Sequence, residues 1–262
     1  MSRLRPIVIT RPRAQAILLA QEITARGGEP VIFPLLEILP LSDNAELQAT
    51  LAQLDRFAMV AFVSPNAIDA AFKYIVQWPP GVAIGIVGEG SRLALERHGV
   101  NAYNAIIFSP PDSAKTDSEG LLEALDLPGL SGRHVLIVRG DGGRELLADS
   151  LRAAGVEVLS LSSYRRQAPV MTPAVTTQLQ ELLTTQNDWI VTSSEALRIL
   201  MQMVQALENV AQNDANVVKM QHKNLLVPHA RIADTAHALG FTSVTLTGSG
   251  DERLLDALQF QL

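Results

Sequence analysis

The chain contains an internal duplication, and this feature constrains its fold more than any other. The segment covering residues 7–125 is followed, at a shift of roughly 130 residues, by a second and weakly similar copy covering 135–258. Four blocks match in the same order: IVITRPRAQAILLAQEITARGGEPVIFP with VLIVRGDGGRELLADSLRAAGVEVLSLS, AFVSPNAIDAAF with IVTSSEALRILM, IVGEGSRLALERHGV with VPHARIADTAHALGF, and SEGLLEAL with DERLLDAL. The preserved order predicts two similar α/β units, and two such units usually face each other across a cleft.

Composition agrees with two globular units. The 262 residues suffice for two domains, and the 47% of hydrophobic residues can fill a core in each. The net charge of -6 argues against nucleic acid or an anionic membrane as a partner. The absence of cysteine excludes disulfides and Cys-ligated metal centres. Because the sequence shows neither an export signal nor an apolar run long enough to span a membrane, we expect a cytoplasmic protein.

Short apolar runs alternate with segments of helical periodicity, as is typical of parallel βαβ units. The expected strands cover residues 7–10, 31–33, 59–63, 83–87, 135–138, 158–161, 189–192, 225–227 and 244–247. The expected helices cover residues 14–26, 66–74, 91–97, 119–125, 144–154, 194–206 and 231–239. The predicted fold class is therefore α/β, with two similar three-layer α/β/α domains built on parallel sheets.

Two extended, proline-containing segments, FPLLEILPLS and SLSSYRRQAPVMTP, follow the second strand of each copy. We interpret residues 33–40 and 161–168 as paired linker strands. If each linker carries the chain into the other unit, the first βαβ units are exchanged between the halves. One domain then comprises 1–36 plus 168–262, and the other comprises 40–162. An unswapped tandem would show the same repeats, but we predict the exchanged arrangement, because two linker strands side by side make a hinge that bends without twisting apart.

The loops that follow the expected strands are rich in hydroxyl groups, glycine and arginine. In parallel α/β sheets these loops bind ligands, because helix N-termini there offer free N–H groups. Such loops suit an anionic ligand. The candidate binding residues are Arg11, Ser64, Asn66, Ser91, Arg139, Ser193, Ser194, His229 and Arg231. The alternative for any one of them, and for Asp251, is a purely structural role, such as helix capping by Ser64, Ser194 and Asp251.

Familiar ligand motifs are incomplete in this chain. The segment from Gly88 to Gly90 begins a dinucleotide fingerprint, but Leu93 stands where the third glycine belongs. The sequence contains no Walker loop, and the loop from Gly248 to Gly250 is not a nucleophile elbow. The five histidines show no metal-ligand spacing with carboxylates, so no metal site is expected.

Tyr164 lies in the second linker and is followed by Arg165 and Arg166. This places a phenol and two cations at the expected mouth between the domains. A linker tyrosine more often packs against a hinge. Its hydroxyl could also donate a hydrogen bond or a proton to a departing oxygen, and the sequence leaves both roles open.

Together these motifs resemble the uroporphyrinogen-III synthase family of tetrapyrrole and haem biosynthesis. The resemblance spans nearly the whole chain through VITRP, FVSPNA, VGEGSRLALERHG, SEGLL, VLIVRGDGGRELLADSLRAAG, the Tyr164-Arg165-Arg166 linker, TSSEAL and PHARIADTAHALG. Each string is weak alone, whereas their order and spacing are specific. The resemblance implies a two-domain lyase that cyclises hydroxymethylbilane, a linear tetrapyrrole with eight carboxylates, to uroporphyrinogen III.

The resemblance also implies a reaction course. Loss of the terminal hydroxyl from ring A gives an azafulvene-type cation, and the substituted carbon of ring D attacks it to form a spiro-pyrrolenine. This intermediate fragments and recloses with ring D inverted. The protein mainly folds the substrate and stabilises charge. No metal or organic cofactor is implied. The expected enzyme is a monomer in transient contact with hydroxymethylbilane synthase, with no nucleic-acid or membrane partner.

The same resemblance assigns roles to individual residues. Tyr164 matches the family's linker tyrosine and is the candidate for assisting hydroxyl departure. Ser91 stands where family members often have threonine, and Ser64 and Ser193 match hydroxyl-bearing loops. Other positions depart from the family.

These departures concern binding residues. His229 and Arg231 fall where other members carry threonine, and Asn66 replaces a frequent arginine, so the resemblance assigns all three to binding.

Two other functions stay open. The chain could be a non-catalytic hinged binding protein for a small polyanionic ligand, or an interaction domain that uses residues 205–223 as a docking loop. A short disordered-looking insertion would explain that stretch equally well.

Overall fold

The structure is a computed structural model that describes residues 5–112, 117–211 and 215–258. It divides the chain into two compact units: unit 1 comprises Met1–Glu37 and Gln167–Leu262, and unit 2 comprises Ile38–Arg166. The ends of the expected domains, at 1–4 and 259–262, lie outside the described residues. Each unit contains one sheet with helices on both faces, and the strands from β4 (Met59–Phe62) to β8 (Glu157–Gln167) in unit 2 and all strands in unit 1 pair in parallel.

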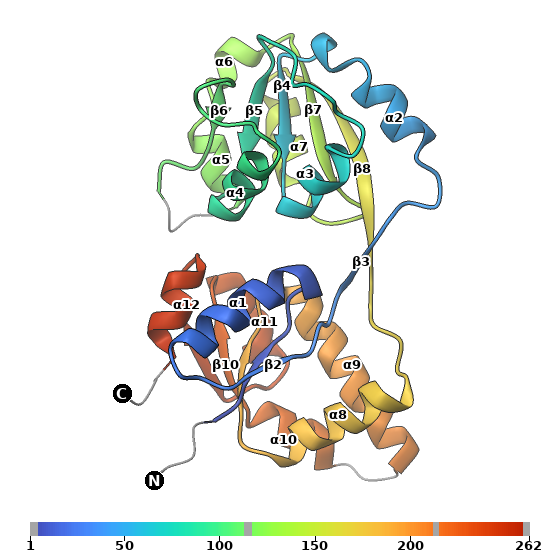
Figure 1. Ribbon diagram of the computed structural model, residues 1–262, viewed down its shortest axis with the longest axis vertical. Helices are drawn as coiled ribbons and strands as arrows, with labels where there is room; N and C mark the ends of the chain where they lie inside the picture. The colour runs from blue at the N-terminus through green and yellow to red at the C-terminus, as the bar shows by residue number, and fades with distance from the viewer. Residues whose placement is uncertain (1–4, 113–116, 212–214, 259–262) are drawn as a thin grey trace. The chain divides into compact units, whose positions relative to one another are not determined.

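Unit 1 is built on a five-stranded sheet with the order β11-β10-β9-β1-β2. Its strands are β1 (Ile7–Ile9), β2 (Pro30–Ile32), β9 (Asp188–Ile190), β10 (Asn224–Val227) and β11 (Ser243–Leu246). All neighbouring pairs are parallel, and Ile7 of β1 lies between Pro30 of β2 and Asp188 of β9. The first βαβ unit of the chain therefore belongs to a sheet whose other strands come from the second half, as Figure 1 shows by colour.

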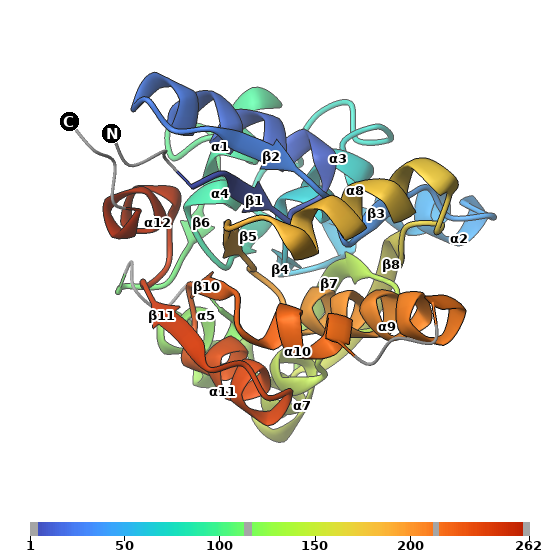
Figure 2. The ribbon, with the colours of Figure 1, turned by 90° about the horizontal axis from the view of Figure 1, so that it is seen from below.

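The helices of unit 1 form two outer layers (Figure 2). They are α1 (Arg13–Ala25), α8 (Pro173–Thr184), α9 (Ser194–Ala211), α10 (Ala215–Gln221), α11 (Ala230–Ala238) and α12 (Asp251–Ala257). Successive residues of a strand point to opposite faces. Accordingly, Ile7 and Ile9 pack with α1 and α12, whereas Val8 packs in the core formed with α8, α9, α10 and α11.

Unit 2 is built on a six-stranded sheet with the order β3-β8-β7-β4-β5-β6. Its strands are β3 (Glu37–Leu39), β4 (Met59–Phe62), β5 (Ala83–Ile86), β6 (Ile107–Phe108), β7 (His134–Gly140) and β8 (Glu157–Gln167). Its helices are α2 (Ala45–Leu51), α3 (Pro65–Ala71), α4 (Glu89–Arg97), α5 (Ser118–Glu123), α6 (Leu127–Leu130) and α7 (Leu146–Ala153), with a 3-10 turn at Leu54–Arg56. Val60 and Phe62 pack with α2, α3 and α4, whereas Met59 and Ala61 pack with α5 and α7.

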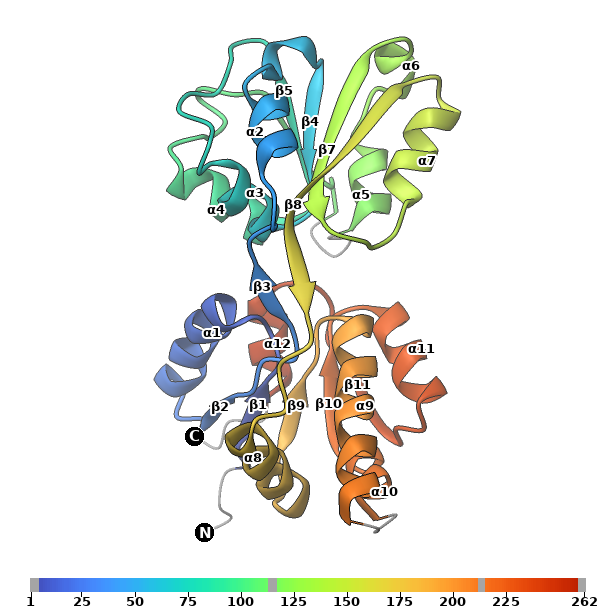
Figure 3. The same cartoon turned by 90° about the vertical axis from the view of Figure 1, so that its right-hand side faces the viewer.

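Apart from the edge strand β3 of unit 2, the two sheets have the same strand order once the repeats are aligned. In unit 2, β7 and β8 take the places that β1 and β2 take in unit 1, and β4-β5-β6 correspond to β9-β10-β11. The predicted α/β class with exchanged first βαβ units is therefore confirmed, and the unswapped tandem is excluded. Figure 3 shows β3 and β8, the two connecting segments, side by side, and they are neighbours in the sheet of unit 2.

The expectation of a docking loop or an insertion at 205–223 is wrong for the described part of that stretch. Helix α9 extends to Ala211, and α10 follows at Ala215–Gln221, while residues 212–214 lie outside the described residues. Val204, Leu207 and Met220 are buried in the core of unit 1. Polar residues on the outer face of these helices hide the helical spacing of the buried ones, which explains the error.

Candidate active site

Tyr164 and Ser64 meet in unit 2 where strand β4 ends. The phenol oxygen of Tyr164 lies 3.1 Å from Oγ of Ser64. The tyrosine is 6% exposed and packs in the core between the sheet and helices α2, α3 and α4. Of the two roles that the sequence left open, the structure shows packing, within the core of unit 2 rather than against a hinge. The same packing places the hydroxyl beside Ser64, the residue that precedes helix α3.

Ser64 also begins helix α3. Its Oγ accepts a hydrogen bond from the backbone N–H of Ala67 at 3.1 Å, and Pro65 occupies the first helical position. Both features are typical of helix starts, because the cap satisfies an N–H without a helical partner and proline has none to satisfy. The capping alternative is therefore correct for Ser64, and it coexists with the contact to Tyr164.

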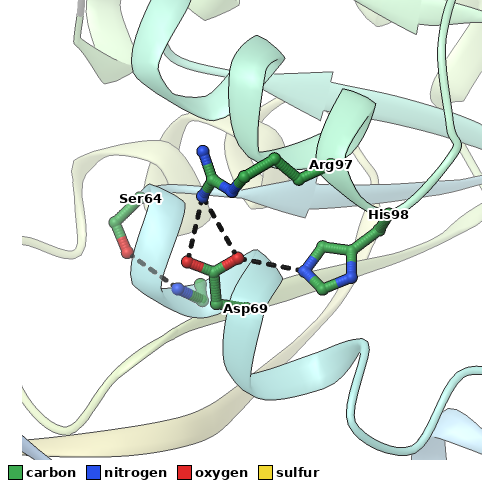
Figure 4. A network of polar contacts seen from close by, with 5 residues as sticks. Ser64, Asp69, Arg97 and His98 are labelled. Carbon is green, nitrogen blue, oxygen red and sulfur yellow. Dashed lines mark hydrogen bonds and ion pairs between the residues drawn. The ribbon is translucent and has the colours of Figure 1, made fainter. Parts of the chain in front are cut away.

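Asp69 ties α3 to α4 (Figure 4). Its carboxylate accepts hydrogen bonds of 3.2 and 3.3 Å from Arg97 and lies 3.0 Å from Nε2 of His98. The His98 ring also stacks on Phe72, with 4.8 Å between ring centroids. These contacts join the C-terminal part of α3 to the C-terminal end of α4.

Ser91 and Asn66 lie in the first turns of these two helices. Ser91 is 2% exposed in α4, and Asn66 is half-buried in α3. Backbone N–H groups and the helix dipole favour a carboxylate at such a helix start. Unit 2 thus brings Ser64, Asn66, Ser91 and Tyr164 to one edge of its sheet.

Arg139, at the end of β7, has partners within its own loop. It donates to Glu145 at 2.6 Å and to the carbonyl oxygen of Gly142 at 2.9 Å, and it is 8% exposed. In this structure the guanidinium organises the loop after β7. These contacts use two of the five N–H groups of the guanidinium.

In unit 1, Arg11 follows β1 and forms an ion pair with Asp251 at the start of α12. The N···O distance is 2.6 Å, and the arginine side chain is 14% exposed. The expectation that Asp251 caps α12 is wrong, because the residue before the helix is Gly250 and Asp251 pairs with Arg11 instead. The sequence pattern missed this pairing because 240 residues separate the partners.

The two serines after β9, Ser193 and Ser194, make different contacts. Oγ of Ser193 accepts hydrogen bonds from the backbone N–H groups of Glu195 at 3.2 Å and Ala196 at 3.4 Å. Ser193 therefore has the capping role at the start of α9 that the sequence predicts for Ser194. Oγ of Ser194 instead accepts a hydrogen bond from the hydroxyl of Thr235 in α11 at 3.1 Å. The expectation that Ser194 is the cap is wrong by one residue. In the aligned repeats, Ser193 is the counterpart of Ser64.

His229 and Arg231 lie at the start of α11, after β10. Nδ1 of His229 is 3.5 Å from Oγ of Ser249, which is 5% exposed, and Arg231 is exposed in the first helical turn. Unit 1 thus gathers Arg11, His229 and Arg231 with the serines at the carboxyl edge of its sheet. Ser249, in the loop from Gly248 to Gly250, is not among the residues that the sequence predicts to bind a ligand.

Within residues 5–112, 117–211 and 215–258, no group of three or more His, Cys, Asp or Glu side chains could hold a metal ion. Over the same described ranges, no helix is long and apolar enough to cross a membrane. A cavity lined by residues such as Glu46, Arg56 and His134 lies at the opposite edge of the unit 2 sheet, where strands begin.

The fold and the two sets of loops define a class: a duplicated α/β protein of two three-layer units with exchanged βαβ elements and anion-suited strand ends. Solved structures share this fold. Uroporphyrinogen-III synthetase from Helicobacter pylori has a TM-score of 0.59 at 15% identity, covering 97% of this chain and 99% of that one. A mutant uroporphyrinogen III synthase from Thermus thermophilus has a TM-score of 0.58 at 14% identity, covering 96% of each chain.

Sequence comparisons identify the family. The family model described as "Uroporphyrinogen-III synthase HemD" matches residues 18–248. The uroporphyrinogen-III synthase of Escherichia coli is 30% identical over 261 residues, which are 97% of this chain and 99% of the relative. That of Salmonella typhimurium is 30% identical with the same coverage. The chain belongs to the uroporphyrinogen-III synthase family, whose members are cyclising hydro-lyases of porphyrin biosynthesis.

Proposed function

We propose that the protein converts hydroxymethylbilane into uroporphyrinogen III, with loss of water and inversion of ring D. The observation that carries the proposal is the similarity to uroporphyrinogen-III synthases along 97% of the chain. The contact between Tyr164 and Ser64 supports it, because it supplies a hydroxyl pair at the ligand-binding edge of a parallel sheet.

The first step needs a proton donor. The C–O bond of the hydroxymethyl group on ring A breaks, its oxygen takes up a proton and leaves as water, and the ring nitrogen stabilises the resulting cation. We assign the donation to the Tyr164 hydroxyl, by a hydrogen bond or a proton, with Ser64 as its hydrogen-bond partner. Neutral hydroxyls suit this task because the leaving oxygen needs a donor while the carboxylates of the substrate are acceptors.

The following steps form and break carbon–carbon bonds. The substituted α-carbon of ring D attacks the cationic carbon and gives the spiro intermediate. Breaking the older bond from that α-carbon to the bridge between rings C and D leaves a cation on ring C. The free α-carbon of ring D then attacks this cation and loses its proton. Holding ring D in place for the first attack is the larger part of the protein's task.

Binding of the substrate rests on its eight carboxylates. We assign this to the candidate residues of both units: Arg11, Ser64, Asn66, Ser91, Arg139, Ser193, Ser194, His229 and Arg231. Among these, Arg11 and Arg231 supply cations, and the starts of α4, α9 and α11 supply backbone N–H groups. Arg139 acts in this scheme by holding the loop after β7.

The proposal also covers the location of the enzyme, its oligomeric state and its partners. We assign the enzyme to the cytoplasm, as a monomer that needs no cofactor and receives its substrate by transient contact with hydroxymethylbilane synthase. Its negative net charge of -6 disfavours nucleic acid and anionic membrane as partners.

The test uses purified protein and freshly prepared hydroxymethylbilane. Products are oxidised to porphyrins and separated by isomer, with heat-denatured protein as the control for spontaneous closure. We expect mainly the type III isomer with native protein and the type I isomer in the control. The type I isomer alone in both samples would refute the proposal.

A further inference from the structure

Strands β7 and β8 contain an irregularity next to Tyr164. Their pairing is regular from His134 opposite Glu157 to Arg139 opposite Ser162, and the next pair is Gly140 with Tyr164. One residue of β8, Ser163, is therefore extra relative to β7. Such a β-bulge changes the direction in which the following side chain points, and bulges are frequent next to active sites.

The bulge determines the face on which Tyr164 lies. In a regular strand, residues three positions apart point to opposite faces of the sheet. Leu161 and Tyr164 are three positions apart, yet both lie in the same core, under helices α2, α3 and α4. Without the extra residue, regular alternation would direct Tyr164 toward the face that α5 and α7 cover, away from Ser64.

Backbone contacts hold the bulge in place. Oγ of the buried Ser163 donates to the carbonyl oxygen of Arg139 at 3.1 Å. The N–H of Asp141 donates to the carbonyl oxygen of Tyr164 at 2.8 Å, and the carboxylate of Asp141 accepts from the N–H of Arg166 at 2.8 Å. The strand is thus fixed on both sides of the tyrosine.

Gly140 provides the space for the ring. A Cβ atom at this position would lie 2.8 Å from Cε2 and Cζ of Tyr164 and 3.0 Å from its hydroxyl oxygen. The φ angle of Gly140 lies outside the left-handed region, so the backbone conformation alone would accept alanine. Glycine is needed here because the phenol lies directly over it.

We propose that Gly140 and Ser163 are positioning residues that direct the Tyr164 hydroxyl toward Ser64. The inference rests on the proposed role of Tyr164 in hydroxyl departure. The Ser163 bulge selects the face of the sheet, and Gly140 lets the ring settle against the backbone. We expect Gly140→Ala to displace the ring while leaving its hydroxyl in the protein.

The first experiment measures the ring position without substrate or turnover. The protein is labelled with ¹³C at Cζ of its three tyrosines, and the Tyr164 signal is assigned with Tyr164→Phe. We expect Gly140→Ala to shift this signal. The control is Gly85→Ala on β5, whose new Cβ would lie 3.3 Å from Leu121. It crowds the core on the other face of the same sheet from Tyr164, so we expect the Tyr164 signal to stay unchanged.

The second experiment is a double-mutant cycle on turnover. We expect Gly140→Ala to lower kcat on the order of 100-fold, the cost of misplacing a catalytic group by about 1 Å. Its effect on KM should be smaller. Added to Tyr164→Phe, the same substitution should lower kcat little further, because the hydroxyl that it misplaces is already absent. Losses that multiply in the double variant would overturn the proposal.

Ser163→Ala serves as the second variant if Gly140→Ala does not fold, since it removes only the bond to the carbonyl of Arg139. It should shift the Tyr164 signal in the same direction. An unchanged Tyr164 signal in every folded variant would refute the positioning role. If the wild-type protein lacks synthase activity, the proposed function fails, whereas the NMR comparison still decides whether Gly140 and Ser163 position the ring.

Discussion

The hydroxyls of Tyr164 and Ser64 lie 3.1 Å apart although 100 residues separate them in the chain. Ser64 belongs to the first copy of the repeat, and Tyr164 belongs to the second. The exchange of the first βαβ units puts β8 into the sheet that contains β4 and so makes the contact. In an unswapped tandem the two residues would belong to different units. The exchange is therefore a condition for the candidate active site.

Removal of the Tyr164 hydroxyl tests its role in the chemistry. We expect Tyr164→Phe to lower kcat on the order of 100-fold, near the lower end of what general acids contribute. Loss of one hydrogen bond should reduce the free energy of unfolding by only about 1 kcal/mol. Steady-state kinetics and urea denaturation measure the two effects. Unchanged turnover would remove Tyr164 from the mechanism.

The two equivalent capping serines offer a matched comparison. Ser64→Ala and Ser193→Ala should each reduce the free energy of unfolding by roughly 1 kcal/mol, because each removes a helix N-cap. Only Ser64 also contacts Tyr164. We therefore expect a clearly larger fall in kcat for Ser64→Ala than for Ser193→Ala. Equal falls in both variants would mean that the contact with Tyr164 has no part in turnover.

Arg11 should act mainly in substrate binding. We expect Arg11→Met to raise KM about tenfold or more, since a charge-assisted hydrogen bond contributes about 1.5–3 kcal/mol. The control is Arg26→Met in the same unit, which breaks a 3.4 Å ion pair with Asp256 at the other end of α1. A similar rise of KM in both variants would indicate a general charge effect.

Lys223 should make the free energy of unfolding depend on pH in the alkaline range. Burial, and to a lesser degree the charge of Lys219, lowers the pKa of Lys223 below its usual value of 10.5, and the ammonium donates to the carbonyl of Thr185. Between the folded pKa and 10.5, the unfolded chain binds this proton more tightly than the folded protein does. The free energy of unfolding contributed by Lys223 therefore rises as the pH increases through that window.

Urea denaturation between neutral pH and about pH 10.5 measures this effect. The wild type should gain stability relative to Lys223→Met as the pH rises through the window. With Lys219→Gln as the background, the gain should be smaller, because one cause of the lowered pKa is removed. A stability difference that stays constant across this range would contradict the assignment.

The sequence predicted the repeats, most strands and the exchanged topology, because hydrophobic periodicity and copied blocks depend on local residue order. The prediction for 205–223 is wrong, because polar outer faces concealed the helical spacing of Leu207 and Met220. Periodicity is informative only when the two faces of a helix differ clearly in composition.

The predicted site residues do follow strand ends, yet their partners could not be read from spacing. Asp251 lies 240 residues from Arg11, and the pairing of Arg139 with Glu145 depends on a loop conformation. The position of Tyr164 depends on a single extra residue in β8. Regular alternation, the rule available from sequence, assigns that side chain to the wrong face.

Ring D inversion is the central claim, and isotope labelling tests it directly. The substrate carries ¹³C at the bridge carbon between rings C and D and at the free α-carbon of ring D. In hydroxymethylbilane these two carbons are not bonded to each other. Inversion through the spiro intermediate joins them, so the product formed by this protein should show a one-bond ¹³C–¹³C coupling between the labels. A cyclic product without that coupling would contradict the account.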